Sequence, residues 1–70
     1  MIPLNYADIG TPQIVKKIGG APDMKKHLED LGFSVGGEVS IVNMLGGNVI
    51  VKVKESRVAI SDELARKIMV

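Results

Sequence analysis

The 70-residue sequence has no cysteine and no tryptophan, and Tyr6 and Phe33 are its only aromatic residues. Without cysteine the chain can form no disulfide, no thiolate metal site and no cysteine nucleophile. The core must therefore be filled by Val, Ile, Leu and Met. The sequence also lacks an apolar run near the roughly 20 residues of a membrane helix, and its start lacks a signal-peptide pattern. We therefore expect a cytoplasmic protein without direct membrane insertion.

Neither sign of charge is in large excess: the chain has nine Lys and Arg and eight Asp and Glu, and its net charge is +1. Nucleic-acid binding needs a concentrated basic face, and single-stranded RNA also needs aromatic stacking platforms. We therefore expect no nucleic-acid partner. The composition, with 46% hydrophobic and 24% charged residues, is typical of a globular chain. Its length suits one small domain spanning residues 1–70.

The stretch from Pro22 to Ile41 predicts a short helix, a glycine stop and the start of a strand. Pro22 suits the first helical position, and Gly32 suits the left-handed position that ends a helix. We expect Phe33 to fold back onto Leu28 in the last turn. The apolar residues of this helix recur on one stripe: Met24, Leu28 and Leu31.

Short segments rich in valine and isoleucine predict strands over residues 13–18, 38–44, 49–54 and 57–60, with 69–70 closing onto the first strand. The predicted faces of the first strand are Ile14, Lys16 and Ile18 on one side, and Val15 and Lys17 on the other.

Turns and flanking segments complete the pattern. Leu45 to Asn48 predicts a hairpin turn, and Ser61 predicts the N-cap of a short helix in which Leu64 and Ile68 pair. We expect the first ten residues to pack down through Ile2, Leu4, Tyr6 and Ile9. The whole predicts a mainly β fold: a small, closed antiparallel barrel with one covering helix and a short C-terminal helix.

Catalytic constellations are not recognisable in this sequence. His27 is the only histidine, and nothing marks a Ser-His-Asp arrangement around it. The glycine pairs at 19–20, 36–37 and 46–47 match no phosphate-binding loop and are read as turns. We therefore expect neither enzymatic activity nor a cofactor.

A metal site on the helix is a hypothesis with a simpler alternative. Asp23 precedes His27 by four residues and Asp30 follows it by three, which directs the three side chains towards one face. They could ligate a divalent transition metal loosely. The alternative is a solvated helix face, because metal sites usually need three or four rigidly held ligands.

A second set of apolar residues, Val42, Met44 and Ile50, is predicted on the strand face opposite the inward-pointing valines. Either the first ten residues and the helices cover this set, or it is a partly exposed patch that binds a partner. Met44 and Leu45 at the hairpin tip suit an adaptable contact. With the nearby Lys52, the predicted partner-binding residues are Met44, Leu45, Ile50 and Lys52.

Several motifs follow one another in a specific order: Leu4, Gly10, Val15-x-x-Ile18-x-Gly20, Leu28-x-x-Leu31-Gly32-Phe33-x-x-Gly36, Val58-Ala59-Ile60 and Ala65-x-x-Ile68-x-Val70. On these motifs, which run from Leu4 to Val70, the chain resembles the ferrous iron transport protein A (FeoA) family. It departs from the family pattern at Lys25-Lys26-His27 and at Ser61, where arginines are common.

The resemblance implies an SH3-like barrel and a small cytosolic accessory protein of ferrous iron uptake. It implies that this protein binds and modulates the membrane ferrous iron permease (FeoB-type), whose cytosolic part carries a GTP-binding domain. An influence on GTP hydrolysis through an arginine would have to use Arg57 or Arg66, the only arginines present. A weak homo-oligomer is compatible with this role.

The alternative belongs to another class of protein. The same barrel resembles the C-terminal domain of iron- and manganese-dependent repressors, but the chain is too short to add a DNA-reading helix-turn-helix. It would then be a stand-alone SH3-like interaction domain, able to bind a divalent transition metal weakly.

Overall fold

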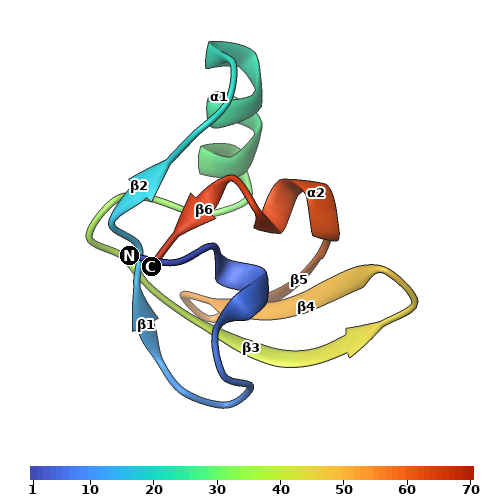
Figure 1. The fold of residues 1–70 in the computed structure, drawn as a ribbon. Helices are drawn as coiled ribbons and strands as arrows, with labels where there is room; N and C mark the ends of the chain where they lie inside the picture. The colour runs from blue at the N-terminus through green and yellow to red at the C-terminus, as the bar shows by residue number, and fades with distance from the viewer.

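The computed structural model describes all residues from Met1 to Val70. The elements are η1 (Leu4–Tyr6), β1 (Gln13–Ile14), β2 (Lys17–Ile18), α1 (Pro22–Asp30), β3 (Glu38–Leu45), β4 (Asn48–Val53), β5 (Ser56–Ser61), α2 (Asp62–Ala65) and β6 (Ile68–Met69). Four strands form one antiparallel sheet in the order β1-β3-β4-β5, and β2 and β6 form a second, two-stranded antiparallel sheet. Figure 1 shows α1 at one end of the molecule and the two termini side by side. None of the helices has the length and apolar character needed to cross a membrane.

The buried core consists of 15 residues, all of them apolar. The inward side chains of the large sheet alternate along its strands, as a sheet with one buried face requires: Val39, Ile41, Val49, Val51, Val53 and Ile60. The predicted mainly β fold with a covering helix and a short C-terminal helix is confirmed. The prediction that the barrel is closed is wrong, because no hydrogen-bonded ladder joins β5 to β1 or to the β2–β6 pair.

The end of α1 follows the sequence prediction closely. Gly32 has φ +108° and donates its N–H to the Glu29 carbonyl at 2.9 Å, and Phe33 donates to the Leu28 carbonyl at 3.0 Å. These two bonds are the pair that defines a Schellman motif. Leu28 and Phe33 are fully buried. The glycine stop therefore turns the chain so that Phe33 joins the core beside the helix that it follows.

The predicted single strand over residues 13–18 is wrong, because the chain changes sheets in its middle. Val15 exchanges backbone bonds of 2.9 and 2.8 Å with Gly37 and Gly36, whereas Lys16 donates to the Met69 carbonyl at 2.8 Å. β1 and β2 thus belong to different sheets. The predicted faces are wrong as well, since Val15 and Ile18 are both buried while Ile14 is 49% exposed.

The two chain ends pack differently from the prediction. Ile2 and Val70 exchange backbone bonds of 2.9 and 2.8 Å, which ties the termini together. Leu4 is buried as expected, but Ile2, Tyr6 and Ile9 are exposed. The N-cap prediction is confirmed by a 3.2 Å bond from the α2 backbone to the Ser61 hydroxyl.

The C-terminal helix is shorter than predicted. It ends at Ala65, and Ile68 lies in β6 rather than on the helix. Ile68 is nevertheless fully buried, because its pairing with Ile18 in the small sheet directs it into the core.

Candidate functional site

The hairpin that joins β3 to β4 is the first part of the candidate surface. Leu45 pairs with Asn48, and the turn between them has φ +52° at Gly46 and φ +86° at Gly47. Positive φ at both central residues is the geometry of a two-residue type I′ turn, which glycine adopts without strain. The predicted hairpin turn is confirmed, and it places Met44 and Leu45 at the tip.

A β-bulge changes which side chains share a face of this hairpin. The register of β3 against β4 shifts between Ile41 and Asn43, which leaves Val42 without a partner on β4. Beyond the bulge, Asn43 pairs with Ile50 and Met44 pairs with Val49. Directly opposed residues of an antiparallel pair lie on the same face of the sheet.

The predicted common face for Val42, Met44 and Ile50 is therefore wrong. Met44 lies on the face of the buried Val49, whereas Ile50 lies on the opposite face. The physical reason is that an extra residue shifts the two-residue alternation by one position.

The opposite face of the large sheet brings together three of the four predicted contact residues. Leu45, Ile50 and Lys52 lie on this face, and their cross-strand partners on β5 add Ala59 beside Ile50 and Arg57 beside Lys52. We call these five residues the outer sheet face. Leu45 is 57% exposed, Lys52, Arg57 and Ala59 are exposed, and Ile50 is half-buried.

Met44 is separated from this face but not from the solvent. It is 39% exposed at the hairpin tip, on the side that leads to the core. The predicted contact residues do not include Arg57 and Ala59. The regular pairing of β5 with β4 decides their position, and the signal that could have found them is the short turn at Glu55-Ser56 between two predicted strands.

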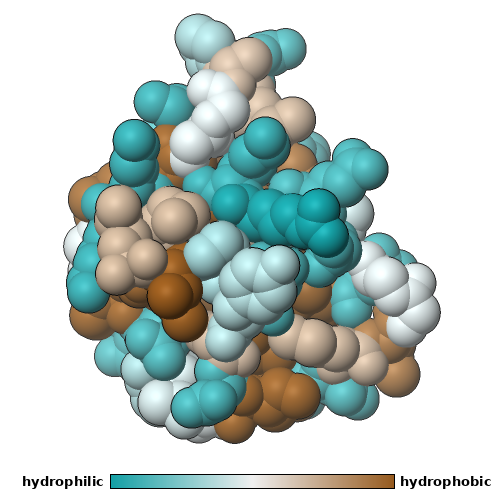
Figure 2. Space-filling model, viewed as in Figure 1, coloured by the Kyte–Doolittle hydropathy of each residue, from teal (hydrophilic) through white to brown (hydrophobic).

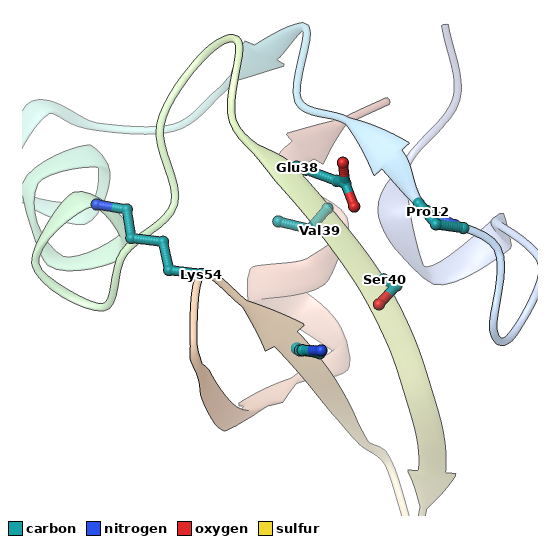
Figure 3. A pocket seen from close by; sticks show the side chains of 6 residues that line it. Pro12, Glu38, Val39, Ser40 and Lys54 are labelled. Atoms are coloured by element: carbon teal, nitrogen blue, oxygen red, sulfur yellow. The ribbon is translucent and has the colours of Figure 1, made fainter.

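A shallow hollow of about 440 Å³ lies next to Lys52, at the end of the hairpin away from its tip. Pro12, Glu38, Val39, Ser40 and Lys54 complete its lining, and Figure 3 shows Glu38 and Lys54 on different flanks of it. Neither Lys52 nor Lys54 forms an ion pair with Glu38. The only ion pair in the molecule joins Arg66 to Asp62 on α2, at 2.9 Å. The hollow therefore offers unpaired ammonium groups beside the outer sheet face.

The side chains proposed for a metal site remain on the surface of α1. Asp23, His27 and Asp30 are all exposed. The structure contains no group of three or more His, Asp and Glu side chains placed to hold one metal ion. What the helix offers is a solvated face, and metal binding by these residues stays a hypothesis.

Other exposed apolar side chains lie outside the five residues of the outer sheet face. Ile9, which is 56% exposed, forms a parallel bridge with Ile41, and Gly10 donates to the Ile41 carbonyl at 2.8 Å. Val42 at the bulge is 36% exposed. Figure 2 shows apolar surface along the lower rim of the molecule, whereas polar surface dominates the centre of this view.

Comparison with known proteins gives a consistent answer. Residues 2–70 match the family model of the FeoA domain. A candidate Fe(2+) transport protein A of Methanocaldococcus jannaschii is 37% identical over 70 residues, which cover all of this chain and 85% of that protein. A crystal structure described as the iron uptake regulatory protein FeoA superposes with a TM-score of 0.86 at 27% identity, covering 96% of this chain and 89% of that one.

A fold likeness extends to a manganese-dependent transcriptional repressor, with a TM-score of 0.85 at 19% identity. The match covers 94% of this chain but 38% of the repressor chain, so the shared unit is one part of that protein. At this identity the likeness shows the fold alone. Both solved structures agree with the SH3-like fold that the family resemblance implies.

Proposed function

Because the chain belongs to the FeoA domain family of ferrous iron transport proteins, we propose that it is a cytoplasmic accessory protein of ferrous iron uptake. In this proposal it binds the membrane ferrous iron permease (FeoB-type) through the permease's cytosolic part, which carries the GTP-binding domain. It modulates the permease by contact and performs no chemical step itself.

The observation that carries this proposal is the exposure of apolar side chains at the hairpin tip. Leu45 is 57% exposed and Met44 is 39% exposed, although both belong to a regular ladder. Burying a leucine side chain contributes about 1.5–3 kcal/mol relative to leaving it exposed. A partner that closes around the tip would cover Leu45 on one face and Met44 on the other.

Two cations further along the outer sheet face give this contact a polar border. Lys52 and Arg57 are exposed on the same face as Leu45 and Ile50. An apolar centre with a charged rim is the usual anatomy of a protein interface. Charges at the rim of an interface act mainly on partner choice and on the association rate. Leu45 and Ile50 would therefore contribute most of the affinity, and Lys52 and Arg57 most of the selectivity.

A pull-down with the soluble cytosolic part of the permease tests the proposal. We expect it to retain the wild-type chain at physiological salt and to lose the Leu45→Asp and Ile50→Asp variants. Val35→Asp is the matched control, because Val35 is 66% exposed and lies in the loop between α1 and β3. Far-UV circular dichroism confirms that each variant is folded.

Two outcomes would contradict the proposal. Equal retention of Leu45→Asp and Val35→Asp would place the contact elsewhere on the chain. Failure of the wild type to be retained would remove the permease as partner and favour the stand-alone interaction domain.

A further inference from the structure

The last strand of the large sheet has one unpaired side. β5 pairs with β4 along its whole length, from Ser56 opposite Val53 to Ser61 opposite Asn48, without a register shift. β5 ends the sheet order, so no strand lies on its other side. Backbone groups on that side are therefore free to pair with another chain.

The free groups can be identified from the ladder. Hydrogen-bonded and non-hydrogen-bonded pairs alternate along an antiparallel ladder, and Val53–Ser56 closes the turn. Ser56, Val58 and Ile60 then face β4, while Arg57 and Ala59 direct N–H and C=O groups outwards. No backbone bond outside the β4–β5 ladder involves Arg57 or Ala59, and both residues are exposed.

The other edges of this sheet are protected, which makes the β5 edge distinctive. β1 is only two residues long. The free part of β3 carries the bulge after Ile41, and the Asn43 side chain accepts the Met44 N–H at 2.8 Å. Short strands and bulges are common devices against strand addition. β5 has neither device, and it contains no proline.

Charge beside this edge indicates the kind of strand that it accepts. Lys52 and Arg57 are directly opposed on the outer sheet face, and like charges at such positions are destabilising. No carboxylate lies within 4.0 Å of either cation, since the Arg66–Asp62 pair is the only ion pair in the molecule. Lys54 follows Lys52 in the turn and adds a third cation. An acidic side chain on an added strand would relieve this repulsion.

We propose that the free edge of β5 binds an extended acidic segment of a partner protein as an additional strand. One acidic side chain of the segment lies directly beside Arg57, with Lys52 one strand further away on the same face. The side chain two residues away lies beside Ala59 and is apolar, because it covers the half-buried Ile50 across the sheet. This inference stands whether or not the permease supplies the segment.

A titration of the ¹⁵N-labelled chain with a designed peptide tests it. The probe is a blocked peptide of about seven residues with one glutamate and, two residues further on, one valine among threonines, and the control peptide has lysine in place of that glutamate. We expect the glutamate peptide to shift the Arg57 and Ala59 amide resonances and to slow their hydrogen exchange. The lysine peptide should bind about tenfold more weakly, because attraction at opposed positions becomes repulsion.

Variants separate backbone pairing from charge. Ala59→Pro removes one outward N–H at a position where an edge strand tolerates proline, and it should abolish the shifts. Arg57→Glu should weaken the glutamate peptide about tenfold, whereas Lys25→Glu on α1 should leave its affinity unchanged. The ¹H–¹⁵N spectrum of each variant shows whether it is folded.

Three results would overturn the inference. One is the absence of shifts at Arg57 and Ala59 with millimolar glutamate peptide, and another is equal binding of the two peptides. The third is a change of the same resonances with protein concentration alone, which would assign the edge to a second copy of this chain. Each readout uses peptide and protein without the permease, so its failure is distinguishable from failure of the proposed docking.

Discussion

Replacing Gly32 by alanine should destabilise the fold through backbone strain at the end of α1. Gly32 has φ +108°, outside the left-handed region that L-residues reach at about +50° to +70°. An added Cβ would lie 3.5 and 3.6 Å from the Val53 methyl groups, which is ordinary contact. The cost is therefore conformational and not a steric clash.

The magnitude follows from two opposing effects. A non-glycine residue in the left-handed conformation costs about 1–2 kcal/mol, and φ +108° places Gly32 at the upper end. Alanine also restricts the unfolded chain, which offsets about 0.4–1 kcal/mol. We expect Gly32→Ala to lower the free energy of unfolding by about 1–1.5 kcal/mol and the melting temperature by about 4–12 °C.

Urea unfolding followed by far-UV circular dichroism measures this change. Gly19→Ala is the matched control, because Gly19 has no positive φ and an added Cβ would lie 3.6 Å from the Lys67 carbonyl oxygen. The control should keep or slightly raise stability. If Gly32→Ala were as stable as Gly19→Ala, the argument that the positive φ of Gly32 makes glycine necessary at the end of α1 would be refuted.

Three further predictions test other parts of the structure. Ser61→Ala removes the 3.2 Å bond that its hydroxyl accepts from the α2 backbone, so the free energy of unfolding should fall by about 1 kcal/mol in urea titrations. Lys54→Gly relieves φ +55° in the β4–β5 turn and should raise stability in the same assay by up to about 1 kcal/mol; a loss would contradict that conformation. Because Asp23, His27 and Asp30 form no converging ligand group, titration calorimetry of ferrous, manganous or zinc ions should give equal, negligible heats for wild type and His27→Ala. Heat that appears only in the wild type would establish a metal site there.

The sequence predicts α1 well because its signals are local. Pro22 at the start, Gly32 at the end and Phe33 after it all lie within one stretch, and each acts through its own backbone or the adjacent turn. Helix caps depend on neighbours three or four residues away. This one stretch of sequence therefore contains the groups that determine where α1 begins and ends.

The sequence predicts the strand faces less well, because segments distant along the chain decide them. The bulge at Val42 exists only in relation to β4, which sets the register on both sides of it. Likewise, Val15 bonds to Gly36 and Gly37 while Lys16 bonds to Met69, so partners far along the chain divide the expected strand. The alternation of side chains within one strand does not show which segments that strand pairs with, or in which register.

The candidate surface shares this limit. Leu45, Ile50 and Lys52 lie on one face because β4 is regular and the bulge ends before Leu45. An uninterrupted alternation predicts Met44 on the same face, and the bulge interrupts that alternation. Arg57 and Ala59 join the surface through the pairing of β5 with β4.

The most direct test of the account is a ¹H–¹⁵N titration of the labelled chain with the cytosolic part of the permease. We predict that the amide resonances of Leu45, Asn48 and Ile50 shift on binding, because these residues surround the exposed hairpin tip. Shifts confined to α1 and β2, or an unchanged spectrum at saturating partner, would contradict docking through the outer sheet face.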